Sequence, residues 1–299
     1  MRASALMTTG RTGCAFLLWA AVAVASPGAT LDRAEELYRR TEYRQALQLL
    51  EAGPERTAAA YELIGRCFYM LEDFKKASDA LEKATAADPR NARAWNWLGK
   101  AYGKRAETSS FLTAPSYASK ARQYFVRAVE MDLHNLDAID DLFEYYLEAP
   151  GLLGGGVDKA ANLGEKVREQ DPAKYHSMKA RLAEKQKQLP QAEQFWRQAA
   201  QLAPSQVGRL VDLAKFFARQ GRFSESEETF QRAAKIAPDN IQLKFEHAKA
   251  YLRAGRNREA ARKLLEEYLK APLTPDDPPR AEAERLLQSI ARRGLGGAD

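Results

Sequence analysis

The sequence predicts an all-α solenoid, a fold in which helical hairpins stack one after another along the chain. The first observation is a repeat of about 34 residues, by which Gly65 corresponds to Gly99 and Trp196 to Phe230. The second is that apolar residues within each period lie three and four positions apart, which is the spacing of a helix. The third is a series of prolines that close successive periods, at Pro89, Pro172, Pro204, Pro238 and Pro272.

The solenoid is expected to occupy residues 26–272 and to hold about seven helix-turn-helix units. Their expected bounds are near 27–57, 58–91, 92–135, 136–172, 173–206, 207–240 and 241–274. Gly221 and Gly255 stand at matching turn positions, where glycine suits the left-handed conformation that ends a first helix. Residues 273–299 are expected to form a stiff linker, a capping helix over 279–293 and a flexible tail.

The first 25 residues have the pattern of a secretory signal peptide. Arg2 and Arg11 precede an apolar stretch over residues 14–25, which ends in small residues at Ala23 and Ala25. We expect cleavage after Ala25 and a periplasmic or secreted protein. The alternative, an uncleaved anchor, would make this segment the only contact with a membrane. Cleavage would leave a single cysteine, so an internal disulfide is excluded.

The unit at 58–91 carries a fuller pattern of large and small residues, namely Tyr61, Ile64, Gly65, Phe68, Ala77, Leu81, Ala84 and Pro89. Similar patterns begin at 92, 173, 207 and 241. By these residues the chain resembles tetratricopeptide repeat (TPR) proteins of the exported bacterial type. The resemblance implies a right-handed solenoid that acts as a non-catalytic scaffold and binds other proteins in a concave groove.

The unit at 136–172 departs from the pattern. Phe143 stands where a small residue is expected, and Gly164 stands where a large one is expected. We interpret the two as a compensating pair, in which the Phe143 ring fills the space that Gly164 leaves, because a core tolerates exchanges that conserve volume.

Two segments interrupt the period between a first and a second helix, near 103–117 and over 149–156. Insertions in repeat proteins form loops on one face, often a binding face. The glycine run at 151–156 lacks the strand and the Gly-Lys-Ser/Thr signature of a phosphate loop, so we interpret it as an inter-helix loop. An enzyme or a ligand-binding protein that uses these two loops remains the first alternative.

The sequence offers no catalytic or metal-binding constellation. His134, His176 and His247 stand in different units at no metal-ligand spacing, and we interpret them as core or edge residues. Cys67 is interpreted as a packed thiol. We therefore expect no cofactor, no metal and no enzymatic activity.

Charge supplies the functional prediction. In the resembling family, positions 9 and 13 of each first helix line the groove, and here they are mostly basic. The candidate partner-binding residues are Arg66, Lys100, Lys104, Arg181, Lys185, Lys215, Arg219, Lys249 and Arg253. The fourth unit interrupts this row with acidic residues. A row of cations along a concave wall attracts anions, so the expected partner is an acidic protein segment.

A polyanion binder is the second alternative. The net charge of +6 falls to +4 when Arg2 and Arg11 leave with the signal peptide, which is modest for nucleic acid, so no nucleic-acid partner is expected.

Overall fold

The computed structural model describes residues 27–53 and 56–295, and within them it contains fifteen α-helices, one 3₁₀ helix and no strand. The predicted signal peptide at 1–25 and residues 296–299 lie outside the described residues. The helices are α1 (Pro27–Arg39), α2 (Tyr43–Ala52), α3 (Ala58–Met70), α4 (Phe74–Ala87), α5 (Ala92–Thr108), α6 (Ala114–Met131), α7 (Leu136–Glu148), η1 (Gly151–Leu153), α8 (Val157–Glu165), α9 (Pro172–Lys185), α10 (Leu189–Leu202), α11 (Val207–Arg219), α12 (Phe223–Ile236), α13 (Ile241–Arg253), α14 (Arg258–Lys270) and α15 (Arg280–Leu295).

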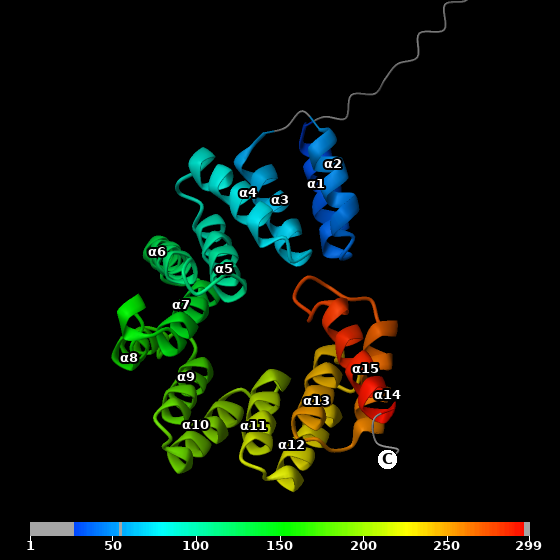
Figure 1. The fold of residues 1–299 in the computed structure, drawn as a ribbon. Coiled ribbons are helices and arrows are strands. Elements are labelled where there is room, and N and C mark those ends of the chain that lie inside the picture. Colours follow the sequence, from blue (N-terminus) through cyan, green and yellow to red (C-terminus); the bar gives the residue numbers. More distant parts are fainter. Residues whose placement is uncertain (1–26, 54–55, 296–299) are drawn as a thin grey trace, which may run out of the picture.

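The helices pair into hairpins that stack in chain order, which confirms the predicted α-solenoid (Figure 1). The first helix of each hairpin faces the inside of the curve, and the second faces the outside. The stack bends until its last helix, α15, approaches the first two hairpins. There Arg285 donates two hydrogen bonds to the carboxylate of Glu72, at 3.1 and 3.4 Å, across 213 residues of sequence. The inner wall therefore surrounds a central space.

Small residues allow the two helices of a hairpin to pack closely, as the repeat pattern predicted. A Cβ built on Gly65 would lie 2.4 Å from Leu81 Cγ, and one built on Gly99 would lie 2.6 Å from Phe125 Cδ1. Leu81 and Phe125 occupy the matching large position of the second helix and are both buried. A methyl group at either position would therefore force the facing side chain to shift.

The turns inside the hairpins use left-handed backbone conformations. Gly221 has φ 72° and Gly255 has φ 67°, which confirms the prediction for these two positions. Thr41, Glu72 and Lys187 hold the corresponding position in other hairpins with φ near 60°. The turn geometry is thus kept even where a side chain makes it less favourable.

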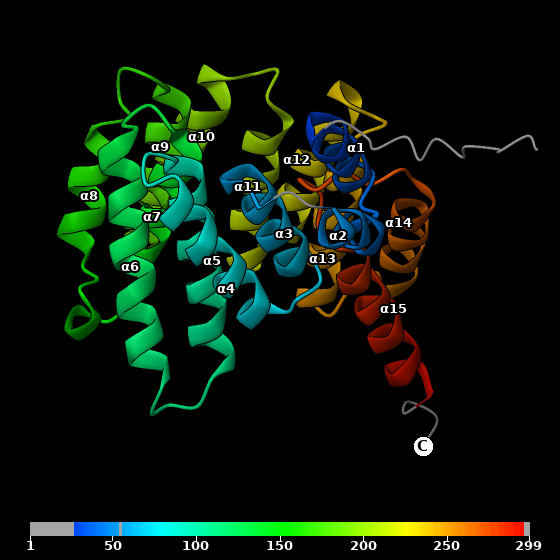
Figure 2. The same ribbon diagram turned by 90° about the horizontal axis from the view of Figure 1, so that it is seen from above.

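The segment predicted as an insertion over 103–117 is mostly helical. Helix α5 continues to Thr108 and α6 begins at Ala114, so residues 109–113 alone join the two helices. The expectation of a loop was wrong because both helices are extended by extra residues. The second insertion, 149–156, contains the 3₁₀ turn η1. Both insertions project toward the same side of the solenoid (Figure 2).

The compensation proposed between Phe143 and Gly164 does not involve direct contact at the Gly164 Cβ position. A Cβ built on Gly164 would meet one heavy atom of the described residues within 4 Å, Met178 Cβ at 3.8 Å. Phe143 is fully buried in the same core cluster as Leu163 and Met178, and the Arg181 guanidinium lies 4.8 Å from the centre of its ring. The following hairpin, through Met178, borders the space beside Gly164.

Helix α15 closes the C-terminal end of the solenoid, as the predicted capping helix does. Its buried residues Ala283 and Ile290 pack in one cluster with Leu265 and Tyr268 of α14. The linker before it is held in place, because the Tyr268 hydroxyl donates a hydrogen bond to the Pro278 carbonyl. Among the described helices, none is long and apolar enough to cross a membrane.

Candidate binding surfaces on the inner wall

All nine predicted partner-binding residues lie on first helices, which form the inner wall. Arg66 lies on α3, Lys100 and Lys104 on α5, Arg181 and Lys185 on α9, Lys215 and Arg219 on α11, and Lys249 and Arg253 on α13. Their location on inner helices agrees with the sequence analysis, and their role in binding a partner stays a prediction. The sequence did not show what they contact, and their contacts divide them into two groups.

The cations at position 9 form ion pairs with carboxylates of the neighbouring hairpin. Lys215 Nζ lies 2.9 Å from a Glu246 carboxylate oxygen on α13, and Lys249 Nζ lies 2.8 Å from Glu282 on α15. Arg66 is paired more loosely, at 3.7 Å from Glu35 on α1. These pairs join successive hairpins along the inner wall. We call them the inter-repeat ion pairs.

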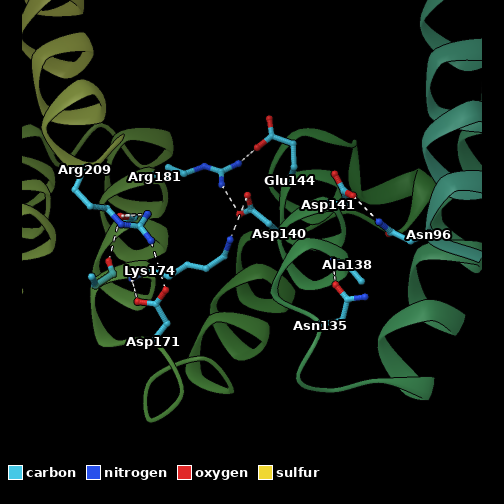
Figure 3. Close-up of polar contacts among 12 residues, drawn as sticks. Asn96, Asn135, Ala138, Asp140, Asp141, Glu144, Asp171, Lys174, Arg181 and Arg209 are labelled. Atoms are coloured by element: carbon cyan, nitrogen blue, oxygen red, sulfur yellow. Dashed lines mark hydrogen bonds and ion pairs between the residues drawn. The ribbon is translucent and has the colours of Figure 1, made fainter. Parts of the chain in front are cut away.

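The acidic fourth unit supplies carboxylates to both of its neighbours (Figure 3). On α7, Asp140 and Asp141 are adjacent in sequence and therefore point about 100° apart around the helix. Asp141 faces α5, where Lys100 Nζ lies at 3.4 Å and Asn96 donates a hydrogen bond of 2.8 Å. Asp140 faces α9, where Arg181 lies at 3.0 Å. The acidic residues are thus the counterparts of the basic residues on either side.

The cations at position 13 are more accessible than those at position 9. The side chains of Lys185 and Arg219 are 38% and 41% exposed, against 26% and 27% for Arg181 and Lys215 one turn earlier. Arg253 is exposed and pairs with no carboxylate in the described part of the chain. Lys185 and Arg219 also form ion pairs with the preceding hairpin, through Glu148 and Glu184, and Lys104 pairs with Glu107 on its own helix, so position 13 differs from position 9 in exposure and, at Arg253, in having no carboxylate partner among the described residues.

A hollow of about 590 Å³ lies between α11 and α13, and we call it the basic hollow. Its charged lining residues are Lys215, Arg219, Lys249, Arg253 and Glu246. Four cations thus face the hollow with a single carboxylate. Arg219 is held from α9 by Glu184, which accepts hydrogen bonds of 2.8 to 3.0 Å from its guanidinium.

A second hollow, of about 410 Å³, lies between α3, α5, α6, α7 and the segment at η1, and we call it the insertion cleft. Its apolar walls are formed by Tyr69, Phe125, Tyr145, Ala149, Pro150 and Leu153. Charged side chains form the rest of the lining. Both insertions contribute to it, because α5 is extended past Gly103 and the second insertion supplies its outer wall.

Burial changes the acid-base properties of the insertion cleft. Desolvation raises the pKa of Asp141, and it outweighs the opposing effects of the Lys100 ammonium and the Asn96 hydrogen bond. Desolvation also raises the pKa of the Tyr69 hydroxyl well above its ordinary value. Asn96 is 6% exposed, and its Oδ1 has no hydrogen-bond partner among the described residues.

Comparison with known sequences identifies the repeat. A family model described as TPR repeat matches residues 65–105, and one described as tetratricopeptide repeat matches residues 183–244. The chain is a tetratricopeptide repeat protein. Tetratricopeptide repeats generally mediate binding to other proteins, which they hold on extended concave surfaces. No curated protein matches this TPR sequence.

Solved structures similar to this TPR protein share its fold. A tetratricopeptide repeat protein from Parabacteroides merdae has a TM-score of 0.57 and 11% identity, over 88% of this chain and 97% of that one. A thermophilic TPR protein of Thermus thermophilus has a TM-score of 0.50 and 18% identity, over 76% of this chain and all of that one. At these identities the likeness shows the stacked-hairpin architecture alone.

Two histidines of this TPR protein pack against aromatic rings, as the sequence predicted. His247 stacks on Phe230 with ring centres 4.2 Å apart, and its Nε2 lies 3.0 Å from a Glu227 carboxylate oxygen. Desolvation lowers the pKa of His247, and Glu227 opposes this shift only in part. His176 lies 5.2 Å from Tyr175 and 6.0 Å from Phe195, measured between ring centres.

The described residues contain no group of three or more His, Cys, Asp or Glu side chains that could hold a metal ion. Cys67 is buried, and desolvation raises its pKa to about 12, which makes the thiol a poor nucleophile. This fits the interpretation of Cys67 as a packing residue.

Sequence reasoning missed the carboxylates Glu246 and Glu282, which hold Lys215 and Lys249. A sequence signal existed, because Glu246 stands 31 residues after Lys215 and Glu282 stands 33 residues after Lys249, which is close to one repeat period. It also missed the insertion cleft, whose walls come from five helical elements and could not be brought together by spacing alone.

Proposed function

We propose that this TPR protein is a non-catalytic scaffold that binds an acidic segment of another protein on its inner wall. One observation supports the proposal above the others: four cations and a single carboxylate line the basic hollow between α11 and α13. Charges that converge on a concave surface reinforce one another and raise the local concentration of anions. An acidic peptide segment would supply a counter-charge to Arg253, the one of these four cations that pairs with no carboxylate in the described part of the chain.

The ion pairs indicate which cations are available to a partner. Lys215 and Lys249 join hairpins, so their charges are largely compensated within the protein. Arg253 is exposed and uncompensated in the described part of the chain, and Arg219 directs its guanidinium toward Glu184 while remaining 41% exposed. The acidic segment is therefore expected to depend most on Arg253.

Reversal of this charge provides the test. In the variant Arg253→Glu, capture of a fluorescein-labelled hexaglutamate peptide should weaken by at least about tenfold, since reversing a charge in the site replaces attraction with repulsion. The matched control is Arg232→Glu on α12, an exposed position on an outer helix. Equal binding by both variants would refute a role for the basic hollow, provided that helical content is unchanged.

We also propose that the protein acts outside the cytoplasm. The support is the signal-peptide pattern of residues 1–25, with its short apolar stretch and small residues before Ser26. N-terminal sequencing of the protein isolated from its own cells should begin at Ser26. An intact N-terminus in the cytoplasmic fraction would refute export.

A further inference from the structure

A hollow of about 360 Å³ lies where the capping helix α15 packs beside the last hairpin, and we call it the capping hollow. Its lining residues on α13 and on α15 recur three and four positions apart, so each helix contributes one face. The lining residues are Lys249, Leu252 and Arg253 on α13, Arg258 at the start of α14, and Glu282, Leu286, Ser289 and Ile290 on α15. The capping hollow adjoins the basic hollow, because Lys249 and Arg253 line both.

The floor of the capping hollow is aliphatic. Leu252, Leu286 and Ile290 belong to the apolar cluster that joins α15 to the last hairpin, and the two leucines are only partly buried. These side chains therefore complete the core on one side and offer aliphatic surface to the hollow on the other. The described residues that line the basic hollow include no large aliphatic side chain.

The charges around this floor leave two cations without a counter-charge. Lys249 pairs with Glu282 at 2.8 Å, so the single carboxylate that lines the hollow is already used. Arg253 and Arg258 are both exposed, and the side chain of neither forms an ion pair or a hydrogen bond in the described part of the chain. A guanidinium keeps its proton in proteins, so both positive charges are permanent.

We infer that the capping hollow binds an aliphatic side chain that lies between carboxylates in the acidic segment of the partner protein. The inference rests on the proposed function and adds to it a requirement for one leucine-like side chain. That side chain would pack on Leu286 and Ile290, and the carboxylates beside it would accept hydrogen bonds from Arg253 and Arg258. Arginine suits this role because its guanidinium can donate two parallel hydrogen bonds to one carboxylate.

Ser289 offers a way to fill the capping hollow from the surface of α15. Its side chain is exposed, and its hydroxyl donates a hydrogen bond of 2.7 Å to the Leu286 carbonyl of the same helix. An indole at this position would occupy the space above the aliphatic floor. Gln288 is exposed on the same helix and lies outside the lining. Ser289→Trp and Gln288→Trp are therefore a matched pair of variants.

The experiment measures binding of two fluorescein-labelled peptides of equal charge to the full chain by fluorescence anisotropy. The leucine peptide is Glu-Glu-Leu-Glu-Glu-Glu, and the serine peptide is Glu-Glu-Ser-Glu-Glu-Glu. The leucine peptide should bind at least about tenfold more tightly, because only its apolar side chain gains from burial. Ser289→Trp should make the two affinities equal, and Gln288→Trp should preserve the difference. Equal affinities in the parent chain, or an unchanged difference in Ser289→Trp, would overturn the inference.

Arg258 tests the electrostatic part of the inference. Arg258→Glu should weaken binding of the leucine peptide at least about tenfold, because repulsion replaces attraction beside the floor. The matched control is Lys263→Glu, an exposed position of the same helix outside the lining, which changes the net charge equally and should change the affinity little. Equal losses in the two variants would contradict a site at Arg258.

The same peptides separate this inference from the proposed function. Loss of hexaglutamate binding in Arg253→Glu, with equal binding of the leucine and serine peptides by the parent chain, would retain the basic hollow and reject the capping hollow. Equal hexaglutamate binding by Arg253→Glu and Arg232→Glu, with a leucine preference that Ser289→Trp removes, would reject the basic hollow and retain the capping hollow through Arg258.

Discussion

Close packing at Gly65 predicts that adding one methyl group should destabilise the solenoid. In Gly65→Ala the new Cβ would stand 2.4 Å from Leu81 Cγ, whereas ordinary contacts begin at 3.4 Å, so the two atoms must separate by about 1.0 Å. Overpacking of this kind costs about 1–3 kcal/mol. Alanine also stabilises a helix interior relative to glycine, by about 0.5–1 kcal/mol. The net expectation is a loss of about 1–2 kcal/mol.

Gly103→Ala is the matched control, because it adds the same methyl group to a first helix where a Cβ would meet no other described atom within 4 Å. This variant should gain about 0.5–1 kcal/mol from helix propensity. Urea unfolding followed by far-UV circular dichroism and by tryptophan fluorescence would measure both changes. Equal free energies of unfolding for Gly65→Ala and Gly103→Ala would refute the packing argument.

A double variant locates the strain. Leu81→Ala alone should cost about 2–5 kcal/mol, because Leu81 is fully buried. In the presence of Leu81→Ala, the methyl group of Gly65→Ala no longer meets the leucine branch. The double variant should therefore lose less than the sum of the single losses by about 1–3 kcal/mol. Strict additivity would mean that the two residues do not share this contact.

Two further predictions follow from the same contacts. Burial holds the pKa of His247 below its ordinary value of 6.5, so the unfolded chain takes up this proton at higher pH than the folded chain does. The free energy of unfolding should therefore fall as the pH is lowered through 6.5. Thermal unfolding measured from pH 7.5 to 5.5 should show a smaller loss of stability in His247→Gln than in the parent chain, and the parent chain's loss in the control His134→Gln, whose histidine is exposed. Gly155→Ala should lose about 1–3 kcal/mol in urea unfolding, because its methyl group would overlap the Ala149 carbonyl; stability equal to the parent chain would show that Gly155 and Ala149 do not pack this closely in the second insertion.

The inter-repeat ion pairs explain why the inner wall carries so many charges. A single exposed ion pair contributes only about 0–1 kcal/mol. Each pair nevertheless connects one hairpin to the next and so helps to fix their relative position. The acidic helix α7 is the extreme case, because Asp141 contacts α5 and Asp140 contacts α9. Only the charges that take no part in these ion pairs remain available to a partner protein.

The architecture and the location of the candidate residues could be predicted from the sequence, because the contacts that form a helical hairpin lie within a single repeat period. Gly65, Gly99 and the glycines at the turns define the close approaches and bends within a single period. The repeat then places position 9 and position 13 of every first helix on one wall. The helical nature of residues 103–108 was missed, because an extended helix and an inserted loop interrupt the period equally.

By itself, the sequence determined that the chain is a series of stacked hairpins, since the spacing of large and small residues within 34 positions specifies each unit and its neighbour. Only the tertiary structure decided which charges remain for a partner. Lys249 and Arg253 are basic residues one helical turn apart on α13 and were both predicted to bind a partner, yet Lys249 lies 2.8 Å from Glu282 whereas Arg253 has no carboxylate partner among the described residues. The reason is physical: the field of a charge depends on what lies within a few ångströms in space, and these neighbours come from other hairpins.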